Sequence, residues 1–141
     1  MKEAFCALTG VFLSWFASLF GGWDDALTTL VIFMAVDYIT GLIVAAVFKQ
    51  SKKTESGAVE SRAGFKGLCR KGAILLVVLV ACRLDMIVGS NFIRDAAVIA
   101  FVVNESISII ENCGLMGVPI PPMLVQAIEI LKKKAETGVK K

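Results

Sequence analysis

Hydrophobic residues occur in long blocks along this chain, separated by short polar segments. Four blocks are apolar over most of their length, and we expect helices at residues 4–22, 26–48, 72–92 and 96–117. A helix rises about 1.5 Å per residue, so about twenty residues reach across the apolar core of a bilayer. The pattern therefore predicts an all-α membrane protein with three to four transmembrane helices. After prolines at 119, 121 and 122, an amphipathic C-terminal helix should follow in the tail at 123–141.

The last apolar block carries polar residues along one side of its second half. On a 3.6-residue period these side chains share one helix face or lie directly beside it. The stripe consists of Asn104, Glu105, Ser108, Glu111 and Asn112. Lipid cannot hydrogen-bond such groups, so they must face protein or water. We therefore expect this stripe to line a pore or to form a polar contact between helices.

Small residues recur at every fourth position in the first two blocks. The spacing is shared by Gly10, Ser14, Ser18 and Gly22 in the first block and by Gly41 and Ala45 in the second. Small residues at this spacing allow close helix–helix approach in lipid, and we expect them to make contacts between copies of the chain. The alternative for the first block is an interfacial helix in which the spacing is accidental.

Charged residues inside the apolar blocks are costly and therefore informative. Asp37 and Arg83 each lie about eleven residues from one end of their block, which places both near the bilayer midplane. Either charge alone would cost about 2.5–3.5 kcal/mol, so we predict an Asp37–Arg83 ion pair. Asp85, a second intramembrane acid, falls at a similar depth. These groups either hold helices together or face a water-filled space. For Glu105 and Glu111 we favour water, because no second basic residue is available within a block.

The distribution of basic residues predicts the topology. Residues 49–71 contain seven Lys or Arg and the tail five, whereas the turn at 89–95 contains only Arg94. Because cytoplasmic flanks of membrane helices are rich in Lys and Arg, we expect the loop 49–71 and the C-terminus to be cytoplasmic. Two arrangements fit: four spans, or three spans with an external N-terminal helix on the membrane surface. The loop should be mobile in its first half and amphipathic from Ser61. The basic residues expected at the membrane surface are Lys49, Lys52, Lys53, Lys66, Arg70, Lys71, Lys132, Lys133 and Lys134.

The composition limits the kinds of chemistry that the chain could carry out. With 141 residues, 57% of them hydrophobic, and a mean hydropathy of +0.77, the chain forms one domain (1–141) that is too apolar for a soluble protein. Histidine is absent and the four cysteines are scattered singly, which removes the usual general base and metal-ligand spacings. Neither intramembrane aspartate lies in a GxGD context, and no glycine-rich phosphate loop occurs. We therefore predict no catalytic residues, metal, cofactor or nucleic-acid partner.

Several short motifs occur in a specific order. They are DYITG at 37–41, SRAGFKGLCRK at 61–71, LD at 84–85, NESISIIEN at 104–112 and GVPIPP at 117–122. By the order and spacing of these motifs, the chain resembles the phage holin family that includes the toxin-secretion and lysis holins of Gram-positive bacteria and their phages. The resemblance covers the chain from about residue 26 to residue 131.

The resemblance implies a non-enzymatic, multi-pass protein of the bacterial cytoplasmic membrane. Such a protein associates with itself and with the anionic bilayer. It then opens lesions that release an endolysin during host cell lysis, or a secreted toxin. Two other classes remain open: a small multidrug-type transporter in which Glu105 or Asp37 binds protons, and an accessory subunit whose buried charges pair with a larger complex.

Overall fold

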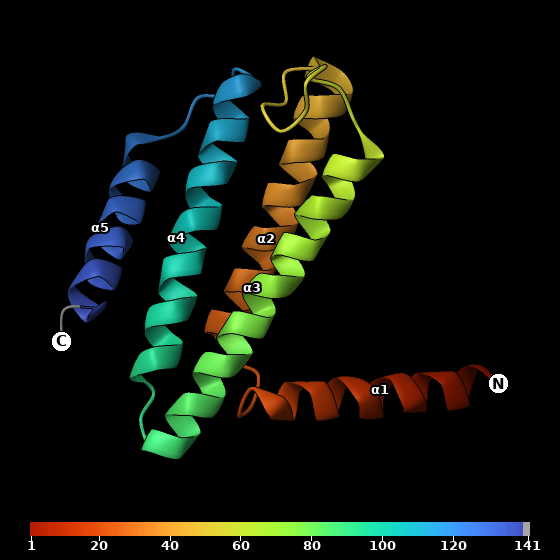
Figure 1. Ribbon diagram of the computed structural model, residues 1–141, viewed down its shortest axis with the longest axis vertical. Helices are drawn as coiled ribbons and strands as arrows, with labels where there is room; N and C mark the ends of the chain where they lie inside the picture. The colour runs from red at the N-terminus through yellow and green to blue at the C-terminus, as the bar shows by residue number, and fades with distance from the viewer. Residues whose placement is uncertain (140–141) are drawn as a thin grey trace.

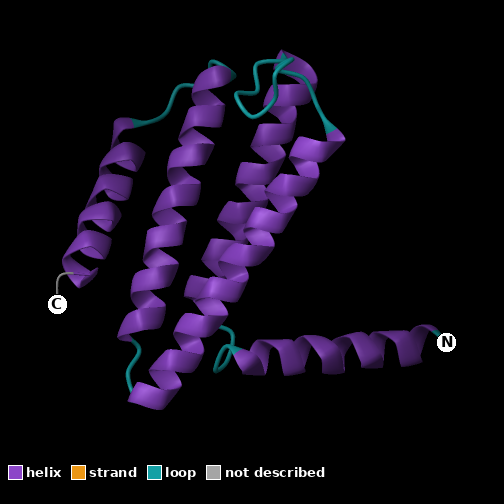
Figure 2. Ribbon diagram, viewed as in Figure 1, coloured by secondary structure: helices purple, strands orange, loops and turns teal. Residues whose placement is uncertain are grey.

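The structure, a computed structural model, describes residues 1–139 and is all-helical over that range (Figure 1, Figure 2). This confirms the predicted all-α class. The elements are α1 (Lys2–Leu19), α2 (Asp25–Ile43), the π-helical turn η1 (Val44–Phe48), α3 (Ser61–Val88), α4 (Phe92–Leu115) and α5 (Pro122–Val139). Lys140 and Lys141, the last two basic residues of the tail, lie outside the described residues.

Helix α4 is the centre of the packing. It contacts α2, α3 and α5, and these helices run side by side in Figure 1. The core between α2, α3 and α4 lies near the end of the bundle at which α1 joins α2. It is formed by Phe20, Leu27, Leu30, Met34, Ile74, Val78, Cys82, Val98 and Val102. The residues of α4 that enter this core, Val98 and Val102, lie in its first half. The polar stripe of α4 lies in its second half, toward the opposite end of the bundle.

Helix α3 begins much earlier than the sequence indicated. We predicted a span at 72–92 preceded by a loop and a separate surface segment, but one continuous helix runs from Ser61 to Val88. Its first three turns are the basic segment, in which Arg62, Lys66 and Arg70 are exposed and Lys71 points toward α2 and α4. The predicted start of this helix was therefore wrong by eleven residues, which changes the depth assigned to every charge on it.

The loop between η1 and α3 closes back on the end of η1. Lys49 ends η1 in the left-handed conformation, with φ of 52°. The backbone N–H of Ser51 donates to the carbonyl of Gly57 at 3.0 Å. Gly57 has φ of +74°, and a Cβ there would lie 2.2 Å from the Lys49 carbonyl oxygen, so only glycine fits. The segment thus folds into a compact turn, and the mobility expected of this part of the chain stays a prediction.

Helix α1 projects away from the bundle roughly at right angles to it (Figure 1). Only its C-terminal end joins the core, where Phe16 and Leu19 pack beside buried Phe20. The helix ends at Leu19, and Gly22 lies in the following turn with φ of +105°. Gly22 is therefore not on the helical face predicted for it. Gly10, Ser14 and Ser18 do line one shallow groove on α1, and their role in contacts between copies stays a prediction.

The second pair of small residues, Gly41 and Ala45, packs within the chain. A Cβ on Gly41 would lie 3.8 Å from the Asn112 side-chain nitrogen of α4, and Ala45 is buried in η1. The absence of larger side chains here lets α2 and η1 approach α4 closely. Gly41 and Ala45 thus take part in packing within the chain, and their role in contacts between copies stays a prediction.

One helical segment, Asp25–Phe48, is by itself long and apolar enough to cross a membrane. Within residues 1–139 no other helix meets that criterion alone. The tail forms the predicted amphipathic helix, α5, which begins at Pro122 and lies along α4 (Figure 1).

Candidate functional site

The main polar feature of the bundle is a set of side chains buried between α2, α3 and α4. The Lys71 ammonium lies 2.7 Å from a carboxylate oxygen of Asp37 and 2.6 Å from one of Glu105. These side chains are only 14%, 6% and 4% exposed, respectively. Each of the three helices contributes one charge, so the ion pairs join all three helices at one level.

Asn112 completes this arrangement from α4. Its side-chain amide donates to the Asp37 carboxylate at 3.1 Å and to the Thr40 hydroxyl at 2.9 Å. No buried side-chain nitrogen or oxygen among the described residues lacks a hydrogen-bond partner, which is the condition for a stable buried polar network. We call Asp37, Thr40, Lys71, Glu105 and Asn112 the buried polar site.

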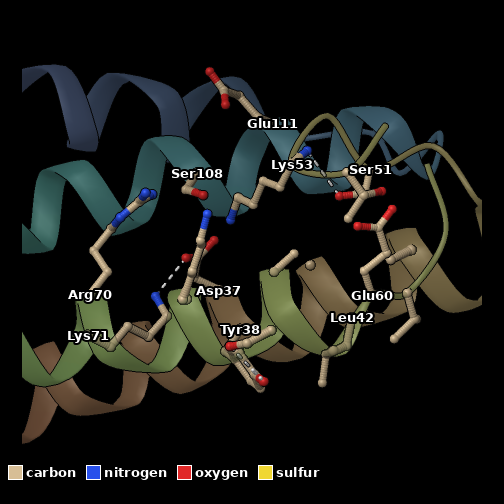
Figure 3. A pocket seen from close by; sticks show the side chains of 18 of the residues that line it. Asp37, Tyr38, Leu42, Ser51, Lys53, Glu60, Arg70, Lys71, Ser108 and Glu111 are labelled. Carbon is tan, nitrogen blue, oxygen red and sulfur yellow. Dashed lines mark hydrogen bonds and ion pairs between the residues drawn. The ribbon is translucent and has the colours of Figure 1, made fainter. Parts of the chain in front are cut away.

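The predicted polar stripe on α4 is thereby divided. Glu105 and Asn112 are buried in the polar site, and Ser108 is half-buried beside it. Asn104 and Glu111 are exposed, and the Glu111 carboxylate points away from Asp37 and Lys71 (Figure 3). In this structure the inner part of the stripe therefore holds helices together, and only the outer part is open to the surroundings.

The predicted Asp37–Arg83 ion pair is wrong. Arg83 is exposed and, within residues 1–139, forms no ion pair, whereas Asp37 binds Lys71. The cause is the position of α3: because the helix ends at Val88, Arg83 lies only five residues, about 7.5 Å of rise, from its end. Lys71, ten residues after the start of α3, reaches the level of Asp37 instead.

Asp85 serves as a helix cap. Its carboxylate accepts hydrogen bonds from the backbone N–H groups of Ile93 and Arg94, at 3.1 and 2.7 Å, and from the Ser90 hydroxyl at 2.7 Å. These N–H groups belong to the first turn of α4, which has no partners of its own for them. Asp85 is therefore buried at a turn between helices near the end of α3, and not at the depth of Asp37 that we expected.

A second ion pair connects the ends of α2 and α4 near α1. The Arg94 guanidinium binds Asp24, and it lies 3.0 Å from Asp95. Asp24 also caps α2 by accepting from the Leu27 N–H at 3.0 Å. Burial alone would raise the pKa of Asp24, but the Leu27 N–H and the Arg94 guanidinium outweigh it and hold that pKa below its ordinary value.

A cavity of about 520 Å³ adjoins the buried polar site at the end of the bundle that carries the basic loop. Residues from α2, η1, the loop, α3 and α4 line it, and Figure 3 shows Lys53 and Arg70 reaching into it from opposite sides. Within residues 1–139 no group of three or more His, Cys, Asp or Glu is placed to hold a metal ion, and the four cysteines are free. The cavity is thus lined by several basic side chains and adjoins the buried polar site, whose charges are paired with one another.

Sequence reasoning missed Lys71 and Thr40 as members of this site. Lys71 was assigned to the membrane surface because it follows a run of basic residues and directly precedes the apolar block. The sequence offered one indication of this role. Lys71 directly adjoins the apolar block, and its side chain is long enough to reach inward from the edge of that block.

A model of the bacteriophage holin family matches residues 14–133. The chain belongs to the bacteriophage holin family. The resemblance indicated by the motifs is therefore confirmed. Holins of this family are generally non-enzymatic, and membership implies a membrane protein.

Relatives of this holin-family chain occur in bacteria and in a phage. It is 39% identical over 127 residues to an uncharacterized 14.9 kDa protein from the region 3′ of nagH in Clostridium perfringens, covering 89% of this chain and 88% of that protein. It is 38% identical over 121 residues to an uncharacterized Listeria monocytogenes protein, covering 85% and 81%. It is 30% identical over 116 residues to a protein of Bacillus phage phi105 named probable holin, covering 82% and 80%. No solved structure matches the chain significantly.

Proposed function

We propose that this holin-family protein oligomerises in the bacterial cytoplasmic membrane and opens lesions that release an endolysin or a toxin. The observation that carries the proposal is the family match over residues 14–133, which includes every residue of the buried polar site. The phage phi105 relative, named probable holin, supports the same function.

The proposed topology has three spans, formed by α2, the apolar part of α3, and α4. One charge that counts against each of α3 and α4 as a single span is neutralised between them, because Lys71 pairs with Glu105 at 2.6 Å. Helices inserted as a bundle therefore avoid the cost of leaving these two charges isolated. Since α1 projects from one end of the bundle roughly at right angles to it (Figure 1), it would lie along the outer membrane surface. This favours the three-span alternative, with the basic loop on the cytoplasmic side.

The proposed mechanism starts from the closed arrangement of the buried polar site. In a single copy, Glu105 and Asn112 bind partners within the chain. Above a threshold density, copies exchange these contacts and turn the α4 stripe toward a shared water-filled space, where ionised and amide groups are well solvated. A transporter, in contrast, would keep one enclosed site and preserve the membrane potential.

The test is controlled expression in a bacterium with growth and membrane potential followed together. A delayed and abrupt collapse of potential, advanced by a dose of uncoupler, is the expected result. Steady growth with an intact potential would contradict lesion formation and favour a transporter or an accessory subunit.

A variant series tests the mechanism in the same assay. Glu105→Gln removes one of the two carboxylates that bind Lys71, so the closed state should weaken and the collapse should come earlier. Glu129→Gln, at an exposed position on α5, is the matched control and should keep the parent timing. If Glu105→Gln also keeps the parent timing at equal membrane levels, the buried polar site does not control opening.

A further inference from the structure

Three basic residues form a row on the first turns of α3. Arg62, Lys66 and Arg70 are spaced four residues apart, and all three line the cavity beside the buried polar site. Like charges at this spacing destabilise a helix. Within residues 1–139 none of the three forms an ion pair with a carboxylate. The helix therefore keeps a costly cationic row that faces a cavity and has no internal counter-charge.

Four acidic residues also line the cavity, but within residues 1–139 none of them is paired with the basic row. Asp37 and Glu105 are bound to Lys71. Glu60 accepts a hydrogen bond from the Ser56 hydroxyl at 3.1 Å, and the Glu111 carboxylate points away from Asp37 and Lys71 (Figure 3). An anion in the cavity would thus meet the basic row without displacing an existing ion pair.

The rest of the lining suits an amphiphile. The Ser51 hydroxyl borders the cavity and can donate to an oxyanion, whereas the Thr54 hydroxyl already donates to the Ala58 carbonyl at 2.9 Å. Leu42 and Ile107 supply apolar surface, and both side chains are exposed, at 38% and 40%. Cationic and apolar surfaces therefore meet in one space of about 520 Å³.

We propose that this cavity binds the phosphate headgroup of an anionic lipid of the inner leaflet. Arg62, Lys66 and Arg70 would hold the phosphate oxygens by charge-assisted hydrogen bonds, and an acyl chain would leave along Leu42 and Ile107. The inference rests on the proposed membrane location, because only then does the cavity lie at headgroup depth. It differs from general attraction of basic residues to the bilayer in requiring a defined site.

The experiment uses the full chain purified in a neutral detergent and mixed with phosphatidylglycerol, and native mass spectrometry counts the lipid retained. The test variant is the triple change Arg62→Gln, Lys66→Gln and Arg70→Gln. The matched control, Lys132→Gln, Lys133→Gln and Lys134→Gln, removes the same charge from exposed positions of α5. Lipid retention should fall about tenfold or more in the test variant and less than twofold in the control. Addition of inorganic phosphate in a parallel arm separates a lipid site from a site for free phosphate.

Equal losses in the two triple variants would mean diffuse attraction and would overturn the proposal. Inorganic phosphate that binds the parent at the basic row, with no retained lipid, would overturn the lipid assignment. Circular dichroism of each variant verifies that the helices are intact. Both variants are also expressed in the membrane-potential assay, so a chain that opens lesions but retains no lipid would refute this inference while leaving the proposed function standing.

Discussion

Removal of the Lys71 ammonium should be the most damaging single change in the bundle. In Lys71→Met the side chain keeps most of its length but loses its charge. The carboxylates of Asp37 and Glu105, which in the parent lie 2.7 and 2.6 Å from the ammonium, are then left without a cation between them. Loss of one partner from a buried ion pair costs about 3–5 kcal/mol. Asp37 keeps the Asn112 amide at 3.1 Å, so most of the penalty should fall on Glu105.

The free energy of unfolding can be measured by titration with a denaturing detergent, followed by far-ultraviolet circular dichroism. Because protonation neutralises the unpaired carboxylates, the loss in Lys71→Met should shrink as the pH is lowered. A triple variant that adds Asp37→Asn and Glu105→Gln removes all three charges and should recover to within about 1 kcal/mol of the parent. Arg83→Met, at an exposed position, should change stability by less than about 0.5 kcal/mol. If Arg83→Met were the more damaging change, or the triple variant failed to recover, the reasoning about this site would be refuted.

Three further changes test individual contacts by the same unfolding measurement. Asn112→Leu removes the amide from the buried polar site and should cost about 1–3 kcal/mol, whereas Asn104→Leu, exposed on the same helix, should cost little; equal effects would contradict this assignment. Asp85→Ala uncaps α4 and should cost about 0.5–2 kcal/mol; unchanged stability would rule out its capping role. Because the pKa of Asp24 is lowered from 3.8, its Arg94 pairing stabilises the protein above that pH and is lost as the pH falls through the lower folded pKa. Asp24→Asn, which can still cap a helix, should reduce this acid dependence, and an unchanged pH profile would count against the pairing.

The sequence predicted the helices well where apolar residues run without interruption. The ends of α2 and η1 fall close to the predicted 26–48, because the Gly-Gly-Trp turn and the basic loop delimit that block sharply. The start of α3 was missed because Arg62, Lys66 and Arg70 made residues 61–71 look like a separate amphipathic segment on the membrane surface. Hydropathy does not distinguish such a segment from the first turns of one continuous helix.

The partner of Asp37 was missed for a related reason. Depth was counted from the predicted start of the third block, so Arg83 was placed near the middle and Lys71 at the surface. Once α3 is extended to Ser61, Lys71 lies within reach of Asp37. The polar stripe on α4 was visible from periodicity alone, but periodicity does not distinguish Glu105, which has a partner in the same chain, from Glu111, which points away from the buried polar site.

The most direct test of lesion formation uses purified protein in liposomes that contain both a small dye and a folded protein of endolysin size. Lesion formation predicts an abrupt release of both cargoes once the protein-to-lipid ratio passes a threshold, with Glu105→Gln shifting that threshold downward. Insertion without release of the protein cargo at any ratio, or release of the small dye alone, would contradict the claim that this chain opens lesions in membranes.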